Sequence, residues 1–179
     1  MKVVKATGVV RRIDDLGRIV IPKELRRTMR IKEGDSLEIF IEGSDRIILK
    51  KYSPVQNVNE FIVEFVESIY NSNHRDIIIT DNERVTAVAG SVKKDIVGKK
   101  ISARLEDRIA KRTTQILERG EGMEICENYE TKKAAVIKPI NVFGDILGCV
   151  IVMAENDVTD VEKSLAEFSG VFMSRYLEG

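Results

Sequence analysis

The stretch that decides the fold of the N-terminal part is Arg11-Arg12-Ile-Asp-Asp-Leu-Gly17-Arg18-Ile-Val-Ile-Pro22-Lys-Glu-Leu-Arg26-Arg27, in a chain of 179 residues. Residues 3–14 have an extended, β-rich pattern that ends at a turn over residues 14–17, and residues 18–22 are typical of a second short strand. Pro22 suits the first turn of a helix, which we predict for residues 23–30. The arginines of this stretch therefore form a compact basic surface, which is what binding to a phosphate backbone requires.

Charge is distributed unevenly along the chain. The 29 basic side chains balance the 29 acidic ones, but residues 1–52 carry 13 basic and 8 acidic residues, a net charge of +5. Residues 53–179 carry 16 basic and 21 acidic residues, a net charge of −5. This asymmetry indicates a nucleic-acid-binding part joined to a part with another role. Because a proline discourages a continuous element across it, we place the boundary at Ser53-Pro54 and predict domains at 1–53 and 54–179.

The rest of the first domain is predicted to be a hairpin. Residues 36–42 alternate in polarity, and a turn at residues 43–45 leads to a second apolar run at residues 47–49. Four strands and one short helix would then share about 50 residues. A unit of this size has a thin core, and such units often need a partner chain to complete it.

The second domain alternates helices and strands. An amphipathic linker helix is predicted over about residues 57–71, and a last helix over residues 159–176 opens with Thr159 and Glu162, the pattern of a capping box. Between them we predict strands at 77–79 and 85–89, a helix at 102–118, and strands near 124–129, 134–139 and 146–154. This order predicts an α+β domain with a mostly antiparallel sheet and flanking helices.

The N-terminal motif resembles the AbrB family of bacterial transition-state regulators. The resemblance runs from Ala6-Thr-Gly through the quoted stretch to Met29, and continues through Gly34-Asp35-Ser-Leu-Glu-Ile to Ile48-Leu-Lys-Lys51. It implies an AbrB-type swapped-hairpin β-barrel built by two chains, and hence an obligate homodimer that binds double-stranded DNA. The family's DNA-contacting arginines fall at the positions of Arg11, Arg18, Arg26 and Arg27.

Arg12 is a fifth candidate for DNA binding, although neighbours on a strand point to opposite faces and Arg12 would then face away from Arg11. The alternative interpretation of all five arginines is a solvated face with local ion pairs to Asp14, Asp15 and Glu24. Residues 1–30, however, hold nine basic and three acidic side chains, an excess that is hard to neutralise internally.

The second domain resembles a GAF domain, a small-molecule sensing or dimerising module. The resemblance rests on Ile96-Val-Gly98-Lys-Lys-Ile101, Val136-Ile-Lys-Pro139-Ile and Leu147-Gly148-Cys-Val-Ile-Val152. An AbrB-type domain joined to a GAF-like domain resembles transcription factors of spore-forming bacteria, which implies a cytoplasmic, nucleoid-associated activator and repressor in the forespore. The ligand, if there is one, is unknown; Gly90-Ser91 and Lys93-Lys94 could line an anion pocket, but a loop of solvated charges is the preferred interpretation.

The two flanking helices carry apolar stripes that suit either a core or a bundle between chains. We predict self-association through residues of these stripes, namely Phe61, Phe65, Ile69, Leu165, Phe168, Phe172 and Tyr176. Combined with the barrel dimer, this contact would give a homotetramer whose avidity raises DNA affinity.

No catalytic residue, metal ligand or cofactor is predicted. His74, the single histidine, is placed at a helix end, and Cys126 and Cys149 are interpreted as reduced core residues. The chain has no apolar run of about 18 residues, so no membrane association is expected. Two other function classes remain as alternatives: an antitoxin-like protein-interaction module on the same barrel, and an enzyme such as a nucleotide hydrolase or a sulfoxide reductase on the GAF-like scaffold.

Overall fold

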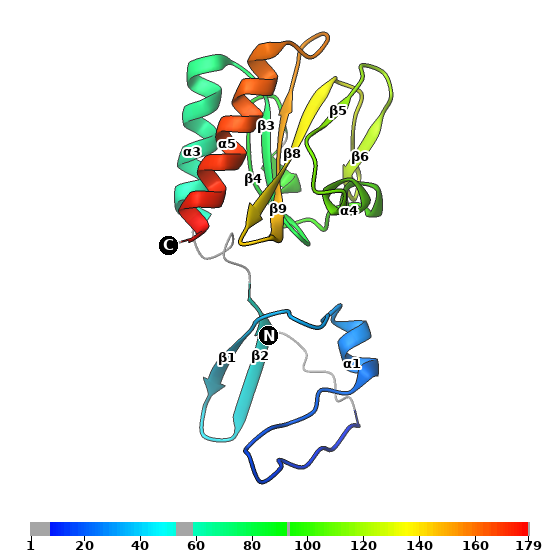
Figure 1. The fold of residues 1–179 in the computed structure, drawn as a ribbon, viewed down its shortest axis with the longest axis vertical. Helices are drawn as coiled ribbons and strands as arrows, with labels where there is room; N and C mark the ends of the chain where they lie inside the picture. Colours follow the sequence, from blue (N-terminus) through cyan, green and yellow to red (C-terminus); the bar gives the residue numbers. More distant parts are fainter. Residues whose placement is uncertain (1–7, 53–58, 93, 179) are drawn as a thin grey trace. The chain divides into compact units, whose positions relative to one another are not determined.

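A computed structural model describes residues 8–52, 59–92 and 94–178. The chain divides into two compact units, residues 1–52 and residues 53–179. Figure 1 shows both units, and each is described by itself below. The predicted boundary at Ser53-Pro54 lies outside the described residues.

The N-terminal unit contains one short helix and one hairpin. Helix α1 spans Lys23–Thr28, and strands β1, Leu37–Glu42, and β2, Arg46–Lys51, pair antiparallel from Leu37 opposite Lys51 to Glu42 opposite Arg46. The predicted helix continued to residue 30, but Arg30 adopts a φ of 53°, which ends the helical path before it. The predicted hairpin is confirmed.

The two strands predicted before α1 are not formed by the described residues. Residues 8–14 and 18–22 run without regular secondary structure, as the long dark-blue segment of Figure 1 shows. A strand needs a neighbour to which its backbone can hydrogen-bond, and neither described strand of this unit pairs with these residues. The expectation of four strands within one chain is therefore wrong.

The C-terminal unit is an α+β domain built on one five-stranded antiparallel sheet. Its elements are α3 Asn59–Asn73, β3 Ile77–Asp81, β4 Val85–Ala89, η1 Lys94–Ile96, α4 Ala103–Ala110, β5 Gln115–Leu117, β6 Met123–Cys126, β7 Tyr129–Thr131, β8 Ala135–Val142, β9 Asp145–Met153 and α5 Asp160–Glu178. The strand order of the sheet is β4-β3-β9-β8-β5, and a separate hairpin pairs β6 with β7. The predicted α+β class and antiparallel sheet are confirmed.

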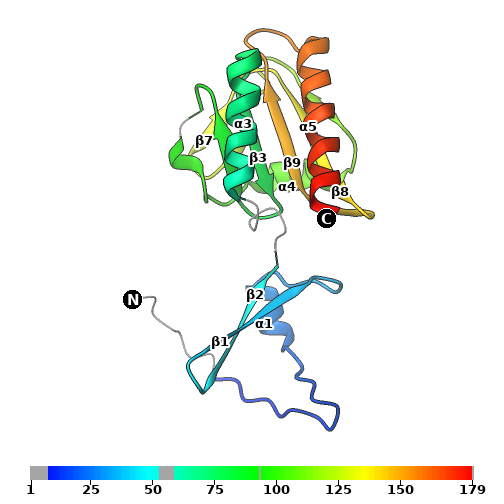
Figure 2. The same cartoon turned by 90° about the vertical axis from the view of Figure 1, so that its left-hand side faces the viewer.

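Helices cover both faces of this sheet. Figures 1 and 2 show α3 and α5 side by side on one face, with α4 on the other. The period of two along each strand divides the core accordingly: Ile77 and Ile79 face α3 and α5, whereas Ile78 lies in the cluster that includes Leu105 of α4. The sheet is thus buried on both sides, which explains its nearly continuous apolar strands.

Two predicted elements of the C-terminal unit need correction. The helix predicted for residues 102–118 ends at Ala110, because Arg112 has a φ of 61° and the following β-branched threonines lead into strand β5. The Gln115 side chain donates a hydrogen bond of 2.8 Å to the carbonyl of Arg108, which caps the end of α4. The strand predicted near residues 124–129 is two strands, β6 and β7, with Asn128 at a φ of 63° in the turn between them.

The two flanking helices are confirmed. The predicted linker helix is α3, although the first residues predicted for it lie outside the described residues. Helix α5 opens with the predicted capping box, in which the Glu162 carboxylate accepts a hydrogen bond of 2.8 Å from the backbone N–H of Thr159. Among the described residues, no helix combines the length and the apolar character that a membrane span needs.

Candidate nucleic-acid interface

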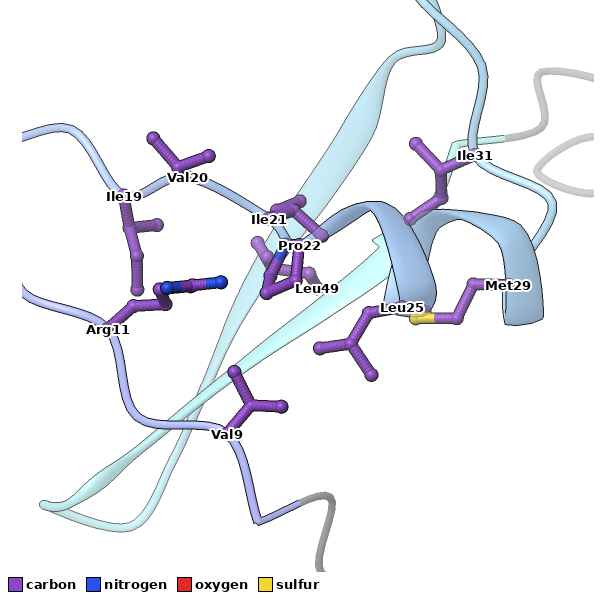
Figure 3. A pocket seen from close by; sticks show the side chains of 10 residues that line it. All are labelled: Val9, Arg11, Ile19, Val20, Ile21, Pro22, Leu25, Met29, Ile31 and Leu49. Atoms are coloured by element: carbon purple, nitrogen blue, oxygen red, sulfur yellow. The ribbon is translucent and has the colours of Figure 1, made fainter.

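Arg11 and Arg12 take different positions on the segment that precedes α1. Arg11 borders an apolar hollow of about 210 Å³, and in Figure 3 its side chain extends toward Pro22. Arg12 is exposed and is not among the residues that line the hollow. The structure thus separates the two neighbours.

Arg18 closes a loop that contains its own carboxylate partner. Asp14 accepts hydrogen bonds from the backbone N–H of Arg18 at 2.7 Å and of Leu16 at 3.0 Å. The second carboxylate oxygen of Asp14 lies 2.8 Å from Nε of Arg18. The backbone N–H of Arg18, followed by its guanidinium, lowers the pKa of Asp14, so the carboxylate is held in its charged form. The Arg18 side chain stays 69% exposed.

Arg26 and Arg27 lie on the last turn of α1, where positive charge is favourable at a helix C-terminus. Their carbonyls also fix the end of the helix, since Arg26 accepts a hydrogen bond of 2.7 Å from the N–H of Ile31. Both side chains are exposed. The helix and the loop that carries Arg18 stand apart in Figures 1 and 2.

Local ion pairs account for little of this basic charge. Among the described residues, Arg18 pairs with Asp14, while Arg11, Arg12, Arg26 and Arg27 make no ion pair. The alternative interpretation expected ion pairs from these arginines to Asp14, Asp15 and Glu24. Among the described residues, only the pair with Asp14 is formed.

The N-terminal unit leaves most of its apolar side chains in solvent. Pro22 is its single buried residue among those described. The exposed apolar residues include Val10, Ile13, Val20, Ile39, Ile41 and Ile47, each more than half exposed. The hollow beside Arg11 is itself lined by apolar side chains, including Leu25 of α1, Met29 at the C-cap of α1 and Leu49 of β2. Apolar surface on this scale is typical of a protein–protein contact.

The residues predicted for self-association form an aromatic row along α3 and α5. Phe61 stacks on Tyr176 with ring centroids 4.1 Å apart, and Phe65 stacks on Phe172 at 5.1 Å. Phe168, which is 57% exposed, continues the row beside Phe172. Leu165 is partly buried against the core, and Ile69 is only 8% exposed, so Ile69 contributes to the core of the unit.

In the loop suggested for an anionic ligand, Ser91 and Lys94 bind acidic side chains of the protein itself. Ser91 donates hydrogen bonds from its backbone N–H and its hydroxyl to the buried carboxylate of Asp76, and the ammonium of Lys133 lies 2.6 Å from the same carboxylate. Lys94 pairs with Glu67, and Lys93 lies outside the described residues. The Asp76 cluster was missed by the sequence analysis, because nothing in the local pattern marks these three residues as neighbours.

His74 follows the last residue of α3 with a φ of 53°, which confirms its predicted place at a helix end. Cys126 and Cys149 are free and buried, as predicted. Burial raises the pKa of both thiols, that of Cys149 to about 12, and thiols in such surroundings are chemically inert. No group of histidine, cysteine and acidic side chains that could hold a metal ion occurs within the described part of the chain.

Comparison with known proteins identifies the family. Residues 57–178 match the family model described as "Stage V sporulation protein T C-terminal, transcription factor". The chain is 39% identical over 176 residues to stage V sporulation protein T of Bacillus subtilis (strain 168), which covers 97% of this chain and 99% of that protein. This chain belongs to the stage V sporulation protein T family. Residues 10–57 also match the model "Antidote-toxin recognition MazE, bacterial antitoxin".

The N-terminal part of this family member has relatives of its own. It is 60% identical over 50 residues to the transition state regulatory protein AbrB of Bacillus subtilis, which is 28% of this chain and 51% of that protein. The putative transition state regulator Abh is equally similar and is matched over 53% of its length. The solution structure of the N-terminal DNA recognition domain of AbrB is 59% identical, covers 28% of this chain and 94% of that chain, and gives a TM-score of 0.24. The predicted resemblance to the AbrB family is confirmed.

Solved structures resemble the C-terminal unit of this family member at low identity. The GAF domain of the nutrient sensor CodY from Clostridium difficile is 16% identical, with 63% of this chain and 81% of that chain covered and a TM-score of 0.46. A free methionine-R-sulfoxide reductase from Thermoplasma acidophilum is 6% identical, with 70% and 95% covered and a TM-score of 0.51. At 6% identity the second likeness concerns the fold alone.

Proposed function

We propose that this protein is a DNA-binding transcription regulator, an activator and repressor of sporulation genes that acts at the nucleoid of the forespore. The observation that carries the proposal is the exposed basic segment of the N-terminal unit, in the part of the chain that is 60% identical to AbrB. Arg11, Arg18, Arg26 and Arg27 are the proposed DNA contacts, with Arg12 as a fifth. Planar guanidinium groups suit this role because they bind phosphates and guanine edges in a bidentate manner.

The DNA-binding species is proposed to be a dimer. The exposed apolar side chains of the N-terminal unit and the two segments without strand partners support completion of a barrel by a second chain. A second chain would also supply a second copy of every arginine. Two such copies would straddle a duplex and contact many phosphates and few bases, so that specificity would depend on DNA shape and deformability.

The C-terminal unit is proposed to join two such dimers. The aromatic row on α3 and α5 supports this role, because Phe168 and Tyr176 remain 57% and 42% exposed although each stacks on Phe172. A tetramer would hold two DNA-binding dimers together and raise affinity through effective concentration. Ligand sensing by this unit stays a prediction, and no ligand is assigned.

The antitoxin alternative has less support. The antitoxin model matches residues 10–57, whereas residues 57–178 match a model described as a transcription factor. Those residues form a folded unit with a five-stranded sheet rather than an extended tail. The enzyme alternative on a sulfoxide-reductase scaffold would need reactive thiols, and both thiols here are buried with raised pKa values.

Alanine substitutions of the arginines test the proposal. The probe is a duplex that the wild-type protein selects from a random-sequence library, and binding is measured with the full chain at two salt concentrations. Arg18→Ala and Arg26→Ala should each weaken binding by about 1 to 3 kcal/mol and flatten the salt dependence, because each removes phosphate contacts.

Arg46→Ala is the matched control for these variants. Arg46 is an exposed arginine of the same unit, paired with Glu42 at 3.1 Å, and lies outside the proposed contact set. Its loss should leave affinity close to that of the wild type. Wild-type affinity in alanine variants of all four proposed contacts would overturn the proposal.

A further inference from the structure

The loop at residues 14–18 holds Arg18 by contacts that lie wholly within one chain. Its backbone is closed by hydrogen bonds of 3.0 Å from the N–H of Asp14 to the carbonyl of Arg18 and from the N–H of Gly17 to the carbonyl of Asp14. Gly17 has a φ of 74°, a conformation that favours glycine and lets the chain turn back. The loop therefore has a defined shape before any second chain or DNA is present.

The Asp14 carboxylate divides its two oxygens between two tasks. One oxygen accepts from the backbone N–H groups of Leu16 and Arg18, which keeps the turn closed. The other accepts from Nε of Arg18 at 2.8 Å. This hydrogen bond therefore uses only Nε of the guanidinium. The two terminal nitrogens of Arg18, Nη1 and Nη2, have no hydrogen-bond partner among the described residues. Those nitrogens form the fork that binds a phosphate or a guanine edge.

We propose that Asp14 is a positioning residue for DNA binding, which holds the Arg18 guanidinium by Nε so that its terminal nitrogens face the DNA. This inference rests on the proposed function, because it assumes that Arg18 contacts DNA. A free arginine side chain must lose much rotamer freedom on binding, and a residue that restrains it beforehand reduces that loss.

A carboxylate beside DNA also has an opposite effect, because its negative charge repels phosphates. Asp14 and its neighbour Asp15 carry the same charge, but Asp15 makes no hydrogen bond or ion pair with the described residues. The two effects can therefore be separated within this one loop. If charge dominates, neutralising either aspartate tightens binding. If positioning dominates, neutralising Asp14 weakens binding and neutralising Asp15 does not.

Asp14→Asn is the informative variant. Its amide oxygen can still accept from the backbone N–H groups of the loop, but its NH₂ group cannot accept from Nε of Arg18. The experiment measures binding of the full chain to the duplex selected by the wild type, for Asp14→Asn, Asp15→Asn, Arg18→Ala and the double variant Asp14→Asn/Arg18→Ala. Asp14→Asn should weaken binding about tenfold, within the range expected for losing one arginine contact. Asp15→Asn should bind as the wild type does or slightly more tightly.

The double variant separates positioning from a general structural role. Once Arg18 is absent, Asp14→Asn should cost little further affinity, because two residues that act through one contact are not additive. The inference fails if Asp14→Asn binds as tightly as Asp15→Asn, or if it costs as much affinity without Arg18 as with it. An Arg18→Ala variant with wild-type affinity would instead remove Arg18 from the DNA interface, and so would overturn the proposed contact itself rather than the role of Asp14.

Discussion

Glu162 shows how one residue joins two segments of the C-terminal unit. It lies at the start of α5 with its side chain 2% exposed, and Nε of Arg75 lies 2.6 Å from its carboxylate. Hydrogen bonds from Thr159 and from Arg75 outweigh the effect of burial and lower the pKa of Glu162 to about 2. The ionised carboxylate therefore stabilises the docking of α5 against the segment between α3 and β3.

Stability should depend on the charge of Glu162 in a defined pH range. Because the folded pKa is lowered, the contribution is fully present above the unfolded pKa, near 4.5, and is lost as the pH falls toward 2. At neutral pH, Glu162→Gln should lower the free energy of unfolding by on the order of 3 kcal/mol. Urea unfolding of both proteins between pH 7 and pH 2 should show the difference shrinking below about pH 4.5.

Glu155→Gln is the control, because Glu155 is exposed and makes no hydrogen bond or ion pair with the described residues. It should unfold like the wild type at every pH. A constant difference between Glu162→Gln and the wild type down to pH 2 would contradict the role of the charge.

At the scale of elements, the sequence predicts best where a pattern is long and local. Helices α3 and α5 and the strands β3, β4, β8 and β9 were found because their apolar residues repeat over several turns or strand positions. The end of α4 was missed because Arg112 turns the chain with a backbone conformation that composition does not reveal. The prediction of two strands before α1 was wrong for a single chain, because a strand forms only beside a pairing partner. The local sequence does not show whether such a partner is present.

Gly148 lies where strands β3 and β9 approach closely. It sits on β9, opposite Asp81 of β3, and a methyl group there would collide with the carbonyl oxygen of Thr80. Gly148→Ala should therefore force β3 and β9 apart and lower the free energy of unfolding by about 2 to 4 kcal/mol, from overpacking and backbone strain together. Thermal or urea unfolding would measure this loss.

Gly144→Ala provides the matched comparison. Gly144 lies in the turn between β8 and β9 with a φ of 90°, and a methyl group there would meet no atom within 4 Å. It should cost only the backbone strain, about 1 kcal/mol. Equal losses for the two variants would show that the close approach of β3 and β9 is not the cause.

At the scale of the whole molecule, the sequence suffices to name the arginine candidates, whose contact with DNA stays a prediction, whereas it does not reveal the Asp76 cluster. The arginine candidates follow from charge and spacing within a few turns of chain, which the sequence displays directly. Asp76, Ser91 and Lys133 come together only through the sheet and its loops, across 57 positions between Asp76 and Lys133. The proposed self-association is harder still to predict from sequence. Its support is the apolar surface that one folded chain leaves exposed.

Phe168→Asp tests the proposed tetramer. A charged side chain in the aromatic row should reduce the tetramer to a dimer without unfolding the unit, because Phe168 is 57% exposed. Light scattering at micromolar concentration measures the mass, and DNA binding should weaken as avidity is lost. Phe143→Asp is the control, since Phe143 is 85% exposed at the β8–β9 turn and makes no ring contact with the described residues of the aromatic row. A monomeric wild-type protein would contradict both proposed contacts.

The uncovered apolar faces of the N-terminal unit have a consequence for gene dosage. If barrel completion requires two chains, the amount of DNA-binding species rises with the square of the chain concentration while single chains predominate. Halving synthesis would then lower that species about fourfold, so promoter occupancy would fall more steeply than in proportion to the protein. The exposed apolar side chains of a single chain would thus make regulation depend on when, and how much of, the protein is synthesised.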